Sequence, residues 1–246
     1  MRKFGLIGKT LTHSFSKKYF EDKFQREQIT NCSYDLFELK TIEAFPVLLK
    51  SNPQLVGLNV TIPYKESVMP YLDSITEQAQ KIGAVNCIRI VDGKTEGWNS
   101  DTVGFSRPLL GLLTETLIPI PTQSFVLGTG GSSKAIVYAL EQLGLPFVKV
   151  SREAKQNCIR YEEIAMRMKE ANLFINTTPV GMFPNQNDCP NIPYEKLSSK
   201  DFLFDLIYNP AETEFLKHGK LQGARTKGGL EMLQLQAEKS WEIWNS

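Results

Sequence analysis

Apolar and polar residues follow two different periods along this chain of 246 residues. Short runs rich in valine, isoleucine, leucine and phenylalanine predict buried strands. Apolar residues three or four positions apart predict amphipathic helices between them. In the first part of the chain, strands are predicted at 2–8, 31–39, 55–63, 84–90 and 94–100. Helices are predicted within 13–28, 41–53 and 74–83, and a turn at Asp92-Gly93 joins the last two strands.

The second part of the chain repeats this alternation of strand and helix. Residues 124–153 read as strand, glycine turn, helix, glycine stop and strand, two more apolar strands follow within 171–179 and 201–210, and 228–246 forms a closing helix. Strands that alternate with helices predict βαβ units and mostly parallel sheets. We therefore predict an α/β protein of two domains. The first, residues 1–101 joined by the helix 229–246, binds substrate, and the second, residues 102–228, is a Rossmann-like dinucleotide domain.

The junction between the domains is predicted near residues 101–120. The stretch LTETLIPIPTQ holds two prolines there, and no internal repeat or low-complexity segment occurs elsewhere. This composition is typical of a connection between two folded units.

Charge and composition narrow the class of protein. The 28 basic and 27 acidic residues give a net charge of +1, so no electrostatic footprint for nucleic acid or a membrane surface is present. No apolar run approaches the roughly 20 residues that span a bilayer, and the N-terminus lacks the apolar region of a signal peptide. We expect a cytoplasmic protein, monomeric or homodimeric, with a small-molecule substrate.

Several catalytic chemistries are disfavoured. The four cysteines contain no CxxC pair, and with only two histidines neither a disulfide framework nor a metal site is expected. No GxSxG elbow is present to expose a nucleophilic serine. Catalysis is therefore expected to use lysine, carboxylates, tyrosine or a bound cofactor.

A glycine turn between a predicted strand and helix indicates a dinucleotide site. Gly128, Gly130 and Gly131 allow a sharp turn and a close approach of a pyrophosphate to the first N–H groups of the helix. Ser132 and Ser133 can cap the helix or bind phosphate oxygens. The alternative is a tight turn without a ligand, because GxGG alone is a weak motif. The strand–turn–helix–strand context favours the dinucleotide.

The end of the next strand favours NADP(H) over NAD(H). Ser151 and Arg152 stand at its tip, with Lys155 close behind. A guanidinium suits a 2′-phosphate, whereas NAD sites place an acidic residue there. The alternative is that Arg152 is a solvated surface residue without a ligand. The neighbouring acidic residue, Glu153, weakens the preference for NADP(H).

A group of polar residues follows the strand at 55–63. Asn59 and Thr61 are two positions apart and point to the same side of the strand. Pro63 ends the strand, so Lys65 lies beyond its carboxyl end, where open α/β sheets bind ligands. A lysine that moves a proton near neutral pH needs burial or a charged neighbour, and Asp101 is a candidate partner.

Further polar residues accompany this group. Ser14 and Ser16 form a candidate carboxylate clamp after the first strand. The segment GAVNC offers Asn86, and Asn99 and Ser100 directly precede Asp101. Taken singly, each has a structural alternative as a helix cap, a turn residue or a solvated side chain. Their joint presence favours a site that binds hydroxyl groups and moves a proton.

These segments together resemble the motifs of the shikimate dehydrogenase (shikimate/quinate dehydrogenase) family, from the first strand to the last helix. IGKTLTHSFS resembles the opening serine motif, NVTIPYK the motif N-V-T-x-P-x-K, GAVN and NSD the next two motifs, and GTGGSSKA the cofactor loop. SRE takes the place of N-R-T, DLIYNP that of D-x-x-Y-x-P, and GGLEMLQLQA matches the closing motif. Lys17 replaces a proline of the family pattern, and Cys87 and Ser100 replace threonines.

The resemblance implies an oxidoreductase that reversibly reduces 3-dehydroshikimate to shikimate with NADPH, in aromatic amino acid (chorismate) biosynthesis. It implies that Lys65 and Asp101 are catalytic. The implied substrate contacts are Ser14, Ser16, Asn59, Thr61, Asn86, Ser100, Tyr208 and Gln236. The implied cofactor contacts are Gly128, Thr129, Gly130, Gly131, Ser132, Ser133, Ser151, Arg152, Thr177, Leu206 and Gly229.

Three other functions stay open from the sequence. The first is an NAD-dependent enzyme of the same fold that acts on quinate. The second is a non-catalytic NADP-binding module. Retention of Lys65 and Asp101 argues against the binding module, since a binder needs no proton donor. A folate-type dehydrogenase with a similar two-domain plan is disfavoured by the serine pair and the spacing of the lysine and aspartate.

Overall fold

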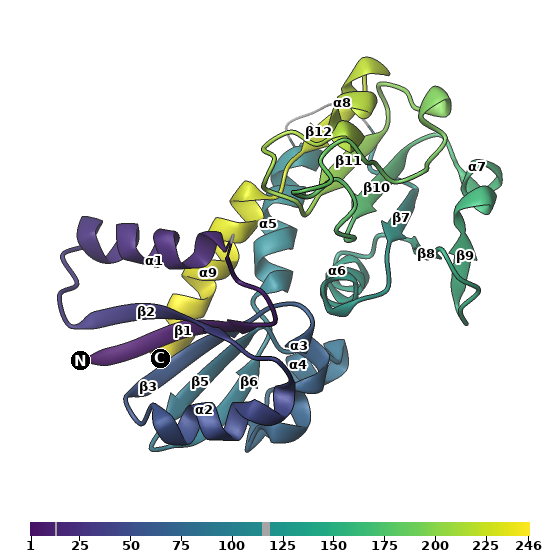
Figure 1. Ribbon diagram of the computed structural model, residues 1–246. Coiled ribbons are helices and arrows are strands. Elements are labelled where there is room, and N and C mark those ends of the chain that lie inside the picture. Colours follow the sequence, from purple (N-terminus) through teal and green to yellow (C-terminus); the bar gives the residue numbers. More distant parts are fainter. Residues whose placement is uncertain (13, 115–118) are drawn as a thin grey trace. The chain divides into compact units, whose positions relative to one another are not determined.

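The structure, a computed structural model, describes residues 1–12, 14–114 and 119–246 (Figure 1). Part of the predicted junction, residues 115–118, lies outside the described residues. The chain folds into two compact units. Unit 1 comprises Met1–Ser100 and Ala237–Ser246, and unit 2 comprises Asp101–Gln236. The last helix therefore begins in unit 2 and ends in unit 1.

Unit 1 is built on a parallel-rich sheet with the strand order β2-β1-β3-β5-β6-β4. β1 pairs in parallel with β2 and β3, whereas β5 runs antiparallel to both β3 and β6. The predicted turn at Asp92-Gly93, with φ values of 49° and 74°, returns the chain directly from β5 to β6 and so makes this pair antiparallel. The strands are β1 Arg2–Gly8, β2 Cys32–Glu38, β3 Leu55–Val60, β4 Ser74–Ile75, β5 Cys87–Val91 and β6 Lys94–Trp98.

Alternation along β1 buries both faces of this sheet. Phe4 and Leu6 join a core with residues of the first and last helices, whereas Ile7 packs with the helices that follow β2 and β3. The helices are α1 Phe15–Arg26, α2 Phe45–Ser51, α3 Tyr64–Ser67, α4 Glu77–Ile82 and α9 Leu230–Trp244, with the 3-10 turns η1 Ile42–Ala44 and η2 Met69–Tyr71. The helix predicted at 74–83 begins later, because Ser74–Ile75 pairs with β6 and Thr76 caps α4.

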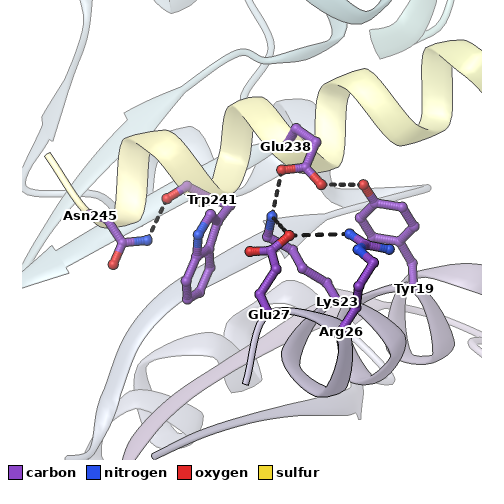
Figure 2. Close-up of polar contacts among 7 residues, drawn as sticks. All are labelled: Tyr19, Lys23, Arg26, Glu27, Glu238, Trp241 and Asn245. Carbon is purple, nitrogen blue, oxygen red and sulfur yellow. Dashed lines mark hydrogen bonds and ion pairs between the residues drawn. The ribbon is translucent and has the colours of Figure 1, made fainter. Parts of the chain in front are cut away.

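A polar cluster fastens the end of α9 to α1 within unit 1 (Figure 2). Lys23 Nζ lies 2.7 Å from a carboxylate oxygen of Glu238 and 2.9 Å from one of Glu27. The Tyr19 hydroxyl also donates to Glu238, and burial together with this carboxylate raises the pKa of Tyr19. Lys23 is only 4% exposed, so its charge is neutralised at a buried position by carboxylates from both helices.

Unit 2 is built on a parallel sheet with the strand order β12-β11-β10-β7-β8-β9. In chain order this is the 3-2-1-4-5-6 arrangement of dinucleotide-binding folds, and the order reverses between β7 and β10. Ligands bind such sheets at the carboxyl ends of the strands on either side of this reversal. The strands are β7 Gln123–Leu127, β8 Phe147–Ser151, β9 Cys158–Arg160, β10 Asn172–Asn176, β11 Phe202–Asp205 and β12 Arg225–Lys227.

Helices cover this sheet on two buried faces. One core contains Phe105 and Phe204, and the other contains the stacked rings of Phe125 and Phe174, whose centroids are 4.9 Å apart. The helices are α5 Asp101–Thr114, α6 Gly131–Gln142, α7 Ile164–Arg167 and α8 Glu214–Leu221, with the 3-10 turns η3 Tyr161–Glu163 and η4 Tyr194–Lys196. The predicted class, α/β with two parallel-rich sheets, is confirmed.

Two further observations concern the described ranges only. None of their helices combines the length and the apolar character that crossing a bilayer requires. They also contain no group of three histidine, cysteine or acidic side chains arranged to hold a metal ion.

Candidate active site

The glycine turn of unit 2 lies at the strand-order reversal, between β7 and α6. Gly128 has φ of +110°, and a Cβ there would lie 2.8 Å from Thr177 Oγ1 and 2.9 Å from Thr178 Cγ2. A Cβ at Gly130, by contrast, would meet nothing within 4 Å. Only glycine therefore fits the tight side of the turn, and its other side is open at the N-terminus of α6. That combination suits a pyrophosphate.

Two residues predicted to bind the cofactor are used inside this turn. Ser133 Oγ donates a hydrogen bond of 2.8 Å to the Gly128 carbonyl, and its side chain is buried. Thr177 Oγ1 donates one of 2.6 Å to the Leu127 carbonyl. Both hydroxyl groups thus stabilise the backbone that surrounds the opening, and their contacts with a cofactor stay predictions.

Cationic side chains lie beside the same turn. Ser151 ends β8, is buried, and accepts a hydrogen bond from the Glu153 N–H at 3.3 Å. Arg152 is exposed and lies near enough to Tyr161 to lower the pKa of that phenol, although burial raises it by more. Lys155 Nζ donates to Thr129 Oγ1 at 3.0 Å, which links the tip of β8 to the glycine turn.

A buried aspartate organises the loops at the ends of β10 and β11. Asp205 Oδ1 accepts hydrogen bonds from Asn176 Nδ2 at 3.1 Å and from the Ile207 N–H at 3.0 Å. Asp205 Oδ2 accepts one from Thr213 Oγ1 at 2.6 Å. Burial raises the pKa of Asp205 to about 6, against the opposing effect of these three hydrogen bonds. Asp205 opens the DLIYNP motif, but its role was missed from the sequence.

The loop held by Asp205 carries two of the predicted site residues and contacts a third, which lies between β12 and α9. The Leu206 N–H donates to the Asn176 carbonyl at 3.1 Å, and the Gly229 N–H donates to the Ile207 carbonyl at 3.0 Å. A Cβ at Gly229 would clash with the Leu206 carbonyl, so glycine is required at that position. Half-buried Tyr208 follows in the same loop. The structure thus brings Leu206, Tyr208 and Gly229 together.

Unit 1 gathers the polar residues predicted around the ends of β3 and β6. Asn86 Oδ1 accepts from the Ser100 N–H at 2.7 Å, and Asn86 Nδ2 donates to Ser100 Oγ at 3.0 Å. Asn59 Nδ2 donates to the Asn86 carbonyl at 3.3 Å and to Ser240 Oγ at 2.8 Å. The Ser100 and Ser240 hydroxyl oxygens are 3.1 Å apart. Ser240 belongs to α9 and was missed from the sequence.

Lys65 lies in α3, just beyond the carboxyl end of β3, and is half-buried. Its carbonyl accepts a hydrogen bond of 2.7 Å from the Val85 N–H, and the Val60 N–H donates to the Asn86 carbonyl at 2.9 Å. The Thr61 N–H donates to the Ile7 carbonyl at 2.9 Å. Backbone hydrogen bonds thus tie Thr61, Lys65 and Asn86 to one end of the sheet.

The predicted serine clamp begins α1. Ser14 is the N-cap residue, and its hydroxyl accepts a hydrogen bond from the Ser16 N–H at 3.3 Å. The Ser16 side chain lies near the Tyr34 phenol and lowers its pKa, although burial raises that pKa by more. The clamp thus combines the structural role of a cap, the alternative considered for Ser14, with half-exposed hydroxyl groups.

Asp101 and Gln236 belong to unit 2. Asp101 is the first residue of α5, is 4% exposed, and follows Ser100 of the cluster in unit 1. Gln236 Nε2 donates to the Leu233 carbonyl at 3.0 Å, and a Cβ at Gly104 would lie 2.9 Å from Gln236 Cβ. Gly104 thereby lets α5 approach α9 closely. The pairing of Asp101 with Lys65 stays a prediction.

Comparison with known proteins points in one direction. The family model of the shikimate dehydrogenase substrate binding domain matches residues 6–88. The shikimate dehydrogenase (NADP(+)) of Clostridium beijerinckii is 40% identical over 261 residues, which cover 99% of this chain and 92% of the relative.

Solved structures agree with this relationship. Shikimate 5-dehydrogenase from Thermus thermophilus, in complex with NADP(H) and shikimate, has a TM-score of 0.85 at 30% identity and covers 99% of this chain and 93% of its own. Quinate dehydrogenase from Corynebacterium glutamicum, in complex with NAD, has a TM-score of 0.86 at 25% identity, with the same coverage. As its motifs predict, this chain belongs to the shikimate dehydrogenase family.

Proposed function

We propose that this chain catalyses the reversible reduction of 3-dehydroshikimate to shikimate with NADPH, in aromatic amino acid (chorismate) biosynthesis. The observation that carries the proposal is the position of Lys65. It lies immediately beyond the carboxyl end of β3, and its backbone is hydrogen-bonded to the segment that leads to Asn86. One end of the sheet in unit 1 thus joins a half-buried ammonium to hydroxyl and amide groups, which suits a polyol substrate that must exchange a proton.

The side chains of unit 1 are assigned the following roles. Ser14 and Ser16 bind the substrate carboxylate, and Thr61, Asn86 and Ser100 bind or orient its ring hydroxyl groups. Lys65 donates a proton to the carbonyl oxygen during reduction and takes it back from the hydroxyl group in the reverse direction. Positioned acid–base catalysis of this kind contributes about 10²- to 10⁴-fold to a rate.

Unit 2 supplies the remaining groups. Asp101 orients the Lys65 ammonium or shares its proton, and Gln236 and Tyr208 contribute further substrate contacts. The tight turn at Gly128 and the open side at Gly130 suit the pyrophosphate of NADP(H). Arg152 and Lys155 suit its 2′-phosphate, since Lys155 contacts Thr129 of that turn and Arg152 directly follows β8, the strand paired with β7. When bound, NADPH supplies the hydride.

A second candidate is NAD-dependent oxidation of quinate. Two observations favour it: the likeness to a quinate dehydrogenase that was solved with NAD, and Glu153 directly after Arg152. An acidic residue at this place favours an unphosphorylated ribose. The two candidates share Lys65 and differ in the acid that is oxidised and in the nucleotide.

The test is a set of parallel absorbance assays on the purified protein. NADPH consumption is measured with 3-dehydroshikimate, NADH is run alongside, and the reverse reaction is run on shikimate and quinate with NADP⁺ and NAD⁺. The proposal expects the highest kcat/KM for the shikimate pair with the phosphorylated nucleotide. Preference for quinate with NAD⁺ would establish the second candidate. NADPH binding without turnover of either acid would leave a binding module.

A further inference from the structure

A set of buried hydrogen bonds runs through unit 1, from the Tyr34 phenol, which lies beside the serine clamp, to the asparagine–serine pair. The Ser16 side chain lies near enough to the Tyr34 phenol to lower its pKa, and the phenol donates to Asn59 Oδ1 at 2.9 Å. Asn59 Nδ2 donates to Ser240 Oγ at 2.8 Å, and Ser240 Oγ lies 3.1 Å from Ser100 Oγ. The path therefore joins residues of β2, β3, α9 and the segment after β6, and it begins beside α1.

Asn59 uses both of its amide N–H donors and accepts one hydrogen bond at its amide oxygen within this path. Its oxygen accepts from Tyr34, and its nitrogen donates both to Ser240 and to the Asn86 carbonyl. An amide nitrogen has two N–H donors, so a direct donation to substrate would require one of these bonds to break. Asn59 is 5% exposed. Its environment therefore fits support of other residues better than direct contact with substrate.

Tyr34 and Ser240 are enclosed to the same degree. Tyr34 is 2% exposed, and its ring stacks on Phe20 with centroids 4.5 Å apart and an interplanar angle of 12°. Burial raises the pKa of Tyr34 well above its ordinary value, while the neighbouring Ser16 side chain opposes this, so the phenol keeps the proton that it donates. Ser240 is fully buried, and the Cys87 thiol also hydrogen-bonds it.

Both ends of the path reach residues assigned to substrate binding, so the path can affect binding as well as the stability of the core. At one end, Tyr34 lies beside Ser16, whose hydroxyl group is assigned to the substrate carboxylate. At the other end, Ser100 exchanges hydrogen bonds with Asn86, which is assigned to the ring hydroxyl groups. A change in the middle of a satisfied buried network moves its neighbours, because each buried polar group must keep a partner.

We propose that Tyr34, Asn59 and Ser240 are positioning residues, which fix Ser16 at one end and Ser100 with Asn86 at the other in the arrangement that binds the shikimate carboxylate and ring hydroxyl groups. The inference rests on the proposed function, since it concerns the same substrate. Under this proposal Asn59 supports the residues that contact substrate, whereas the sequence motif predicts a direct contact.

Tyr34→Phe is the sharpest variant, because it removes one oxygen and keeps the ring that stacks on Phe20. Ser240→Ala removes the hydroxyl group between Asn59 and Ser100. Each variant is expected to raise the KM for shikimate about 5- to 30-fold, the effect of losing one buried hydrogen bond. The KM for NADP⁺ is expected to stay within about 2-fold, because the path lies in unit 1 and the glycine turn lies in unit 2.

Tyr19→Phe is the matched control. It also removes one phenolic oxygen from unit 1, on the helix that carries Ser16, but its hydrogen bond goes to Glu238 and not into the path (Figure 2). Lys23 still joins Glu238 to Glu27 in this variant. General loosening of α1 would affect Tyr19→Phe as much as Tyr34→Phe, whereas positioning affects the second alone.

The experiment combines steady-state kinetics for both substrates with calorimetric titration of shikimate and melting temperatures for all four proteins. A selective loss of shikimate affinity in Tyr34→Phe and Ser240→Ala, with Tyr19→Phe like the wild type, supports the inference. Wild-type KM for shikimate in both path variants overturns it, even if their melting temperatures fall. If the wild type neither binds nor oxidises shikimate, the proposed function itself fails and the inference falls with it.

Discussion

Asp205→Asn is expected to remove a pH-dependent loss of stability from unit 2. The pKa of the buried carboxyl group is about 6 in the folded protein, against 3.8 for an ordinary aspartate. The folded protein therefore binds a proton between about pH 6 and pH 4 that the unfolded chain binds only at lower pH. Asp205 then stabilises the fold progressively as the pH falls through this window, and it costs stability above it.

The size of the effect follows from the difference between the two pKa values. A difference of about two, at roughly 1.4 kcal/mol for each, gives about 3 kcal/mol between pH 4 and pH 7. Asparagine resembles the protonated carboxyl group. Its oxygen can still accept from Asn176 and from the Ile207 N–H, and its nitrogen can donate to Thr213. The free energy of unfolding of the variant, minus that of the wild type, should therefore rise by about 3 kcal/mol from pH 4 to pH 7.

The assay is urea unfolding followed by far-UV circular dichroism at several pH values. Tryptophan emission does not replace it, because Trp98, Trp241 and Trp244 all belong to unit 1. Asp205→Ala is the companion variant. It removes the charge together with the acceptor oxygens and should destabilise the protein even at pH 4. A difference between Asp205→Asn and the wild type that stays constant from pH 4 to pH 7 would refute the reasoning.

Three further predictions concern the cofactor site and the contact between the first and last helices. Gly128→Ala should weaken NADPH binding about 10-fold or more in a fluorescence titration, because alanine at φ of +110° is strained by about 1–3 kcal/mol and its Cβ enters the turn; unchanged binding would contradict this. Arg152→Gln should raise the KM for NADPH about 10-fold in the absorbance assay and leave the KM for NADH unchanged, because only NADPH carries the 2′-phosphate. An equal effect on both KM values would exclude a contact between Arg152 and the 2′-phosphate. Lys23→Met should lower the stability of unit 1 by about 1–3 kcal/mol in urea unfolding followed by tryptophan emission, because it leaves Glu238 without its buried cation. The control is Lys239→Met, whose lysine is half-exposed and pairs with Glu242; its loss should stay below about 0.5 kcal/mol, and equal losses would argue against the cluster.

Much of the fold could be predicted from the sequence, because its strands carry strong local patterns. The apolar run at 55–63 contains the buried strand β3, and the run at 124–127 covers all but the first residue of β7. The positive φ values at Asp92-Gly93 agree with the predicted turn. The strands β9 and β12 were missed. Each has three residues and lies at an edge of its sheet. Three residues are too few to show the alternation of apolar and polar positions by which a strand is recognised in a sequence.

The candidate site likewise contains residues that local motifs predict and residues that only long-range contacts bring together. Motifs at the ends of strands were enough to predict Lys65 and Gly128 as site residues, since turn glycines and residues beyond a strand end are visible in local sequence. Tyr34, Asn59 and Ser240 act through one another, and Asn59 is 181 positions from Ser240 along the chain. Such a contact exists only after the last helix has packed on the first unit, and a single sequence carries no local signal for it.

Steady-state kinetics of Lys65→Ala with NADPH and 3-dehydroshikimate tests the central claim most directly, namely that this side chain moves the proton at the substrate oxygen. The account predicts that kcat falls about 10²- to 10⁴-fold while KM changes far less, because the loss concerns the transition state and not the bound substrate. A variant whose turnover returns to the wild-type rate at high substrate concentration would contradict it, since Lys65 would then contribute binding alone.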